Sequence, residues 1–238
     1  DAYLPLMGIA GNLHRACLLL KGDLLERAER AASAILERTL SGTGLEPHPD
    51  EKHTTSILRE QLLRHAAISG AKSAIAFAGE QFERWLMGKT VHPDIMKSVL
   101  QIAAFAGDQQ TFTSLDQRFV QSQVEHERMN ILVALGCFKE KAPLENALQY
   151  ILDTVPGRNK FVPVVAMAAN PHAIPLLWDW YVSHLELIEQ FHPMFYERVV
   201  AAIVPVAGMD NPQEIKKFFV EYMQKTEKAK DVIKLSLE

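Results

Sequence analysis

A helical repeat of apolar residues, broken at helix-length intervals, is the feature that most constrains the fold of this chain. In the stretch "PQEIKKFFVEYM", the apolar positions follow the spacing i, i+3, i+4, i+7 and i+8: Ile215, Phe218, Phe219, Tyr222 and Met223. This spacing places them on one face of an α-helix. No stretch alternates convincingly between apolar and polar residues with turn signals at its ends, as strands do. The pattern predicts an all-α protein.

Helix-breaking residues divide the chain into about a dozen predicted helices joined by short turns. Four prolines are each suited to the first position of a helix, where a missing N–H costs nothing: Pro93, Pro171, Pro193 and Pro212. Asn170 and Asn211 each precede one of these prolines and can cap the helix that follows. We expect Gly88 to lie at the C-terminal cap of a helix, where glycine is common.

Two neighbouring segments resemble each other. Gly70 aligns with Gly107, a shift of 107 − 70 = 37 residues, and the pair Ala66-Ala67 aligns with Ala103-Ala104. Paired alanines before a turn allow two helices to approach closely. One helix pair per unit, at a period near 40, is typical of HEAT and armadillo repeats. We therefore predict a right-handed α-solenoid of antiparallel helix pairs, with residues 1–238 forming a single helical-repeat domain.

Composition excludes several classes of partner. There are 25 Lys and Arg against 29 Asp and Glu, and the charges are interleaved, so no basic face for nucleic acid is expected. The run from Phe161 to Trp178 carries no charge, but Pro163, Pro171 and Pro175 interrupt it. Such a run is a poor membrane span. We expect neither nucleic acid nor a membrane as partner.

The two cysteines, Cys17 and Cys137, lie in apolar helical patterns and are expected to be buried free thiols. The chain has no Asn-x-Ser/Thr acceptor site, and its first residues, "DAYLPLMG", do not form a secretory signal. These features predict a cytoplasmic protein. Because the sequence lacks an initial Met, we expect it to be a piece of a longer protein.

A search for catalytic equipment finds none in this chain. No two of the nine histidines are four residues apart, so there is no H-E-x-x-H zinc motif. His126 lies between two glutamates, so we expect it on a solvent-exposed face of a helix. The stretch "MGKT" at 87–90 lacks the first glycine of a phosphate loop, because Glu83 stands there. We predict no catalytic residue, no metal ligand and no cofactor in this chain.

Five segments, taken in order, resemble one family. They are "YLPL" at 3–6, "TTSILREQLL" at 54–63, "HERMNILVALGCF" at 126–138, "NPHAIP" at 170–175 with Trp178 and Trp180 after it, and "QEIKKFFVEY" at 213–222. The chain is similar to the C-terminal helical domain of the zinc-dependent gluzincin aminopeptidases, the family of membrane alanyl aminopeptidase and the endoplasmic-reticulum aminopeptidases. Ala173 departs from the family by replacing a turn glycine.

The resemblance implies the role of a non-catalytic part. In such enzymes the zinc helix and the Gly-x-Met-Glu-Asn motif lie on an earlier domain, and neither is found here. The implied partners are the catalytic domain of the same polypeptide, with its zinc, and peptide substrates. The implied function is to cover the active site and to limit access to peptides, in an enzyme that releases N-terminal amino acids.

Arg158 and Lys160, in "PGRNKF", are the candidate substrate-binding residues, because cations borne on a turn can meet a peptide carboxylate. Ordinary surface solubility is the alternative for these two side chains. For the whole chain, the alternative function is a free-standing HEAT-like scaffold that binds another protein. Composition and periodicity fit both functions, and the ordered family segments favour the first.

Overall fold

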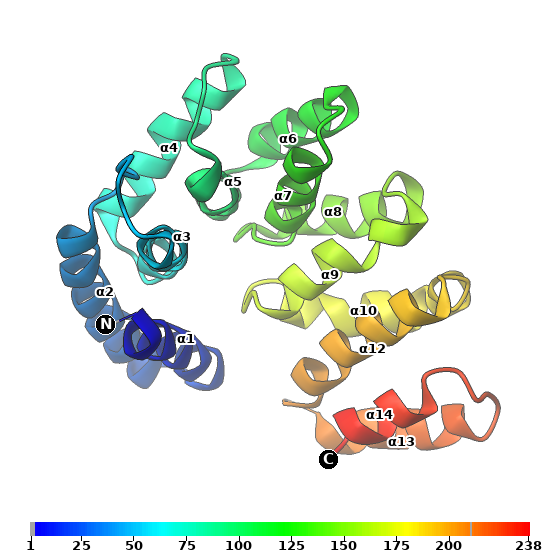
Figure 1. The fold of residues 1–238 in the computed structure, drawn as a ribbon. Helices are drawn as coiled ribbons and strands as arrows, with labels where there is room; N and C mark the ends of the chain where they lie inside the picture. Colours follow the sequence, from blue (N-terminus) through cyan, green and yellow to red (C-terminus); the bar gives the residue numbers. More distant parts are fainter. Residues whose placement is uncertain (1–2, 210) are drawn as a thin grey trace. The chain divides into compact units, whose positions relative to one another are not determined.

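The computed structural model describes residues 3–209 and 211–238, and the regular elements of that part are helices, without a strand (Figure 1). In order they are α1 (Tyr3–Leu19), α2 (Asp23–Thr43), α3 (His53–Ile68), α4 (Lys72–Leu86), α5 (Pro93–Ala106), α6 (Gln109–Gln121), α7 (Glu125–Leu135), α8 (Lys141–Asp153), the 3₁₀ helix η1 (Gly157–Asn159), α9 (Phe161–Ala168), α10 (Ile174–Ser183), α11 (Leu185–Ile188), α12 (Pro193–Gly208), α13 (Pro212–Met223) and α14 (Lys230–Ser236). The predicted all-α class is confirmed.

The chain divides into two compact units. The first holds the residues up to Ala106 and Asp116–Arg118, and the second holds Gly107–Leu115 and Phe119–Glu238. Within the first unit α3 packs on α1, α2, α4 and α5. Within the second, α9 packs on α7, α8, α10 and α12, and α12 packs on α13 and α14. Helices that contact their near neighbours in sequence are typical of solenoids, so the predicted solenoid-like packing is confirmed.

Glycine follows two helices of the first unit, and Gly88 ends its helix as the sequence predicts. Gly70 has φ +92° and Gly88 has φ +73°, conformations that a side chain disfavours. After α4, the Gly88 N–H donates to the Trp85 carbonyl (3.0 Å) and the Lys89 N–H donates to the Arg84 carbonyl (2.9 Å). This is a Schellman motif, and it satisfies carbonyls that the helix leaves free.

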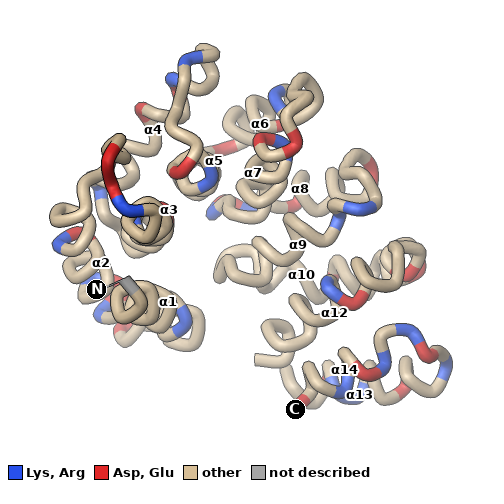
Figure 2. The backbone as a smooth tube through the Cα atoms, in the orientation of Figure 1, with Lys and Arg blue, Asp and Glu red and all other residues tan. Residues whose placement is uncertain are grey.

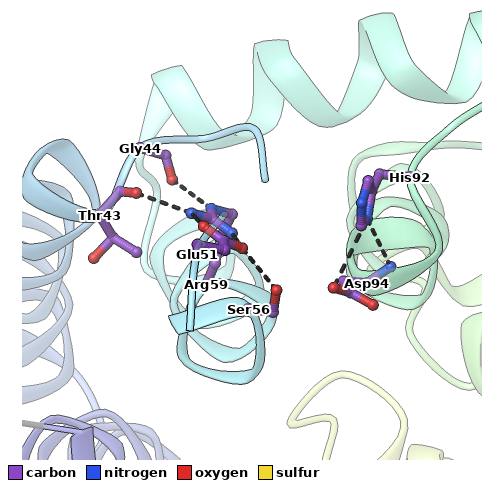
Figure 3. Close-up of polar contacts among 7 residues, drawn as sticks. All are labelled: Thr43, Gly44, Glu51, Ser56, Arg59, His92 and Asp94. Atoms are coloured by element: carbon purple, nitrogen blue, oxygen red, sulfur yellow. Dashed lines mark hydrogen bonds and ion pairs between the residues drawn. The ribbon is translucent and has the colours of Figure 1, made fainter. Parts of the chain in front are cut away.

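A buried arginine secures the connection between α2 and α3 (Figure 3). The Arg59 side chain is fully buried and donates from Nε to the Gly44 carbonyl (2.9 Å) and from Nη2 to the Thr43 carbonyl (3.0 Å). Its guanidinium also forms a two-bond ion pair with Glu51, and the Ser56 hydroxyl donates to the same carboxylate (2.6 Å). A buried charge requires such complete pairing. These bonds hold residues 44–52, which contain no helix, against α3.

The turn before α10 differs from the prediction for Asn170 and Pro171. Pro171 lies in a turn, and α10 begins three residues later at Ile174, with Pro175 in its first turn. The buried Asn170 side chain accepts a hydrogen bond from the His172 N–H (3.1 Å) and donates to the carbonyls of Gly136 (3.0 Å) and Phe138 (2.7 Å). The Asn170 side chain therefore bonds to backbone groups outside α10 and does not cap that helix. Asn211 does precede α13 but makes no side-chain capping bond.

The uncharged run is explained by burial within the second unit. Val162, Val164 and Met167 of α9 and Leu177 and Tyr181 of α10 are buried in its core. Figure 2 shows few charged residues along α9 and the start of α10, whereas acids and bases are interleaved along α2. Among the described residues no helix is long and apolar enough to cross a bilayer.

Neither Cys17 nor Cys137 forms a disulfide, and of the two only Cys137 is buried as predicted, because Cys17 is partly exposed.

Candidate functional site

A groove in the second unit contains both predicted substrate-binding residues. Its volume is about 590 Å³, and it lies between the segment from the end of α8 to the start of α9 and the segment from α11 to the start of α12. Arg158 and Lys160 line it from the first segment, and Phe191, His192 and Phe195 line it from the second. The size falls within the range of small-molecule sites.

A short 3₁₀ turn places the two cations at the groove. Pro156 lies three residues after the end of α8 and is extended (φ −55°, ψ 140°), and the Asn159 N–H donates to the Pro156 carbonyl (2.8 Å) to close η1. Lys160 directly follows η1 and directly precedes α9. Arg158 and Lys160 are two positions apart on this turn, and both side chains line the same groove.

Lys160 is held in place. Its ammonium donates to the Leu152 carbonyl near the end of α8 and lies 5.4 Å from the centre of the Phe191 ring. Burial lowers the pKa of Lys160, and the nearby Asp153 carboxylate partly opposes that shift. A cation above an aromatic ring is stabilised by the ring's negative face. Lys160 is thus a positively charged side chain held in the lining of the groove.

Arg158 is the more exposed cation of the pair. Its side chain is 69% exposed, and its Nη2 lies 3.3 Å from the Glu125 carboxylate at the start of α7. Exposed ion pairs of this kind contribute about 0–1 kcal/mol. The guanidinium can therefore leave Glu125 for a stronger anionic partner at little cost.

Aromatic side chains form the other wall. Phe195 stacks on Phe161 with ring centres 5.4 Å apart and planes 11° apart, and His192 lies 5.3 Å from Phe195. Arg198 lies 4.6 Å above the Phe161 ring. A groove with two cations and an apolar wall is suited to an anion attached to an apolar body.

The aromatic wall was missed by the sequence analysis. Phe191 and Phe195 flank the His192-Pro193 pair, which the sequence marked only as a helix start. They reach the groove because α12 packs on α9, which brings together segments about thirty residues apart. Helical periodicity contains no signal for such a contact.

No metal site accompanies the groove. Across residues 3–209 and 211–238, no three His, Cys, Asp or Glu side chains come together in a way that could hold an ion. His126 is exposed, in agreement with its assignment to a solvated helix face. The described part of the chain therefore offers no set of side chains that could bind zinc.

Comparison with known families identifies the chain. The model of the ERAP1-like C-terminal domain matches residues 1–238. This chain belongs to that family. The resemblance to the C-terminal domain of aminopeptidases is confirmed.

Curated relatives of this ERAP1-like domain are aminopeptidases. Aminopeptidase 2 of Candida albicans is 23% identical over 223 residues, which are 91% of this chain and 24% of that protein. The alanine/arginine aminopeptidase of Saccharomyces cerevisiae is 26% identical over 169 residues, 70% of this chain and 20% of that protein. Glutamyl aminopeptidase of Rattus norvegicus is 21% identical over 179 residues, 71% of this chain and 19% of that protein. The chain thus spans a quarter or less of the length of these relatives.

Proposed function

We propose that residues 1–238 act as the non-catalytic C-terminal domain of a zinc aminopeptidase that releases N-terminal amino acids from peptides. The observation that carries this proposal is the family match over the whole chain. The aminopeptidase names of the relatives support it. Zinc and the catalytic residues would lie on the preceding part of the same polypeptide, because the described residues of this chain supply no ligand set. No chemical step is assigned to this chain.

This domain would form a wall of the space that a peptide occupies beside the active site. A wall of packed helices excludes water and large substrates and positions the peptide, which raises the rate without contributing a reactive group. The cytoplasmic location expected from the sequence is part of this proposal. The alternative of a free-standing scaffold has no observation in its favour beyond the helical repeat that both functions share.

The groove would bind the far end of a peptide. The Lys160 ammonium is fixed over Phe191, and the exposed Arg158 guanidinium can turn to form a two-bond pair with a carboxylate. The rings of Phe191 and Phe195 offer contact area to an apolar side chain next to that carboxylate. Long peptides would reach the groove, and dipeptides bound at the active site would not.

Replacing Arg158 and Lys160 by alanine in the full-length enzyme tests this role. We expect KM for peptides of about ten residues to rise roughly tenfold, since two charge-assisted contacts are lost, while KM for a dipeptide substrate stays within about twofold. Steady-state kinetics with the two substrates gives both values. The matched control is Arg27→Ala with Arg30→Ala, which removes two exposed cations from α2.

Glu125 provides an independent check on Arg158. Glu125→Gln frees the guanidinium, so KM for the long peptide should fall by up to about fivefold, and this gain should vanish when Arg158 is already alanine. If replacing Arg158 and Lys160 by alanine raises KM equally for long and short substrates, the groove does not bind the peptide.

A further inference from the structure

A second pocket of the second unit shares none of its described lining residues with the groove. It lies between α11 and the end of α13, and its volume is about 320 Å³, at the small end of the range for small-molecule sites. Leu185, Phe218 and Tyr222 give it an apolar wall. The Phe218 and Tyr222 rings are parallel to within 8°, with their centres 6.2 Å apart. This wall offers contact area to an apolar side chain of a ligand.

A chain of buried phenols holds one carboxylate at this pocket. The Tyr222 hydroxyl donates to Glu189 Oε1 (2.6 Å), and a carboxylate can only accept. Because that bond uses the only proton of Tyr222, the Tyr196 hydroxyl donates to the Tyr222 oxygen (2.8 Å), and Tyr181 in turn donates to Tyr196 (2.9 Å). Burial raises the pKa of the Tyr222 phenol, so its proton stays in place at neutral pH. Glu189 is therefore oriented from the core of the second unit.

The Glu189 carboxylate can accept a further hydrogen bond. Its Oε2 lies 3.6 Å from the Lys228 ammonium, which is beyond a normal hydrogen-bond distance, and its side chain is 25% exposed. A carboxylate has about four acceptor positions, of which Tyr222 uses one. An ammonium group in the pocket can therefore donate to Glu189 without displacing Tyr222.

Two charges of opposite sign line the same pocket without partners. Among the described residues, neither Glu221 nor Lys225 forms a side-chain ion pair or hydrogen bond. They are four positions apart, a spacing at which glutamate and lysine commonly pair on a helix. Here both side chains are exposed and border the cavity instead. Each is therefore available to a ligand group of the opposite charge.

These charges decide the class of ligand. A simple anion would lie beside the Glu189 and Glu221 carboxylates, and a simple cation would lie beside the Lys225 ammonium. We propose that this pocket binds a free α-amino acid with an apolar side chain, since such a zwitterion complements both signs. Its ammonium group donates to Glu189 and Glu221, and its carboxylate accepts from Lys225. Its side chain packs on Phe218 and Tyr222.

Photolabelling of the full-length polypeptide with L-photo-leucine, the diazirine analogue of leucine, tests the site. Peptide mapping by mass spectrometry separates adducts in this pocket from adducts elsewhere, such as in the active site. We expect labelling of the peptides that contain residues 185–189 and 218–226, and L-leucine should suppress it. 3-Methylbutylamine lacks the carboxylate of leucine and 4-methylpentanoate lacks its ammonium group, so each should compete only at about tenfold higher concentration or more.

Substitutions on α13 and just after it give matched comparisons. Glu221→Gln and Lys225→Met each remove one charge from the pocket, so the concentration of L-leucine that halves the labelling should rise about tenfold. Glu214→Gln and Lys217→Met remove the same charges from exposed positions of α13 outside the pocket, and the value should stay within about twofold. All four side chains are exposed, and surface substitutions of this kind leave stability nearly unchanged.

A pocket that stays unlabelled, or labelling that L-leucine does not displace, would overturn the proposal. Competition by 3-methylbutylamine or by 4-methylpentanoate equal to that of leucine would overturn it as well, because the pocket would then recognise a single charge. The site does not rest on the proposed function, in which free amino acids are the released products. The long-peptide effect expected for Arg158 and Lys160 is measured separately, so either proposal can fail while the other stands.

Discussion

At the scale of single residues, buried polar side chains hold the segments of backbone that no helix holds. Arg59 binds the carbonyls of Thr43 and Gly44, and Asn170 binds those of Gly136 and Phe138. Each side chain supplies donors to carbonyls that would otherwise lie buried without partners, at a cost of about 1–3 kcal/mol each. These residues therefore determine where the chain turns.

Asn170→Asp tests this role through its pH dependence. An ionised carboxylate cannot donate to the two carbonyls and is repelled by them, so the aspartate would have a pKa above its unfolded value of about 3.9. Its stability contribution is then present below that value and lost as pH rises through the folded pKa. We expect a loss of about 2–4 kcal/mol relative to wild type at pH 7 and a smaller loss at pH 4.

Urea unfolding of variant and wild type at both pH values measures this difference. Asn146→Asp is the control, because Asn146 is exposed and should tolerate the charge within about 0.5 kcal/mol. Equal losses at pH 7 and pH 4 would contradict the role of the Asn170 amide as a donor.

At the scale of elements, α7 ends in close contact with α9 at Gly136. A Cβ atom added to Gly136 would lie 2.6 Å from Ala166 Cβ, 2.7 Å from the Pro163 carbonyl oxygen and 2.8 Å from the Met167 nitrogen. Two of these atoms belong to backbone, which cannot move aside alone. Glycine is needed there for space, since its φ of −84° suits any residue.

Gly136→Ala should therefore destabilise the second unit by about 1–3 kcal/mol or more, because the α7–α9 contact must open. Gly79→Ala is the matched control in the middle of α4, where an added Cβ meets no atom within 4 Å. The same substitution there should stabilise by about 0.5–1 kcal/mol. Thermal unfolding of both variants gives opposite signs if the packing is as described, and a neutral Gly136→Ala would contradict it.

The helices and their ends could be predicted from the sequence, but the groove could not. Periodicity, Gly70 and Gly88 locate helices and their ends, because these are local properties of backbone and solvent exposure. Asn170 was misassigned to a cap because its true partners lie more than thirty residues earlier in sequence. Arg158 and Lys160 were located by their turn, but Phe191 and Phe195 join them only through packing between α9 and α12. Long-range contacts of this kind leave no periodic trace.

At the scale of the whole molecule, acid should weaken the first unit more than the second, because the two largest downward pKa shifts, those of His65 and Glu51, lie in the first unit, while burial lowers the pKa of His172 in the second unit by less. Burial, with help from Arg64 and His14, lowers the pKa of His65 to about 3, so its neutral form stabilises the fold above pH 6.5 and this contribution is lost as pH falls toward 3. The pKa of Glu51 is lowered to about 2, and the hydrogen bond from Arg59 is the main cause of that shift. Its contribution is present above about pH 4.5 and is lost as pH falls toward 2.

Acid unfolding followed by fluorescence can separate the units, because Trp85 lies in the first and Trp178 and Trp180 lie in the second. We expect the Trp85 signal to change at higher pH than the other two in single-tryptophan variants. His65→Gln should flatten the loss of stability between about pH 6.5 and 4.5 without removing the later loss below it. Coincident transitions in all variants would contradict the assignment.

The hydrogen bonds and ion pair of Arg59 also affect how susceptible residues 44–52 are to proteolysis. Residues 44–52 contain no helix and present an exposed Lys52, the features of a preferred nicking site. With both ends of that segment tied to a buried guanidinium, its backbone cannot adopt the extended form that a protease cleft requires. The connection between α2 and α3 should therefore survive limited digestion with trypsin, and cleavage should begin elsewhere in the chain.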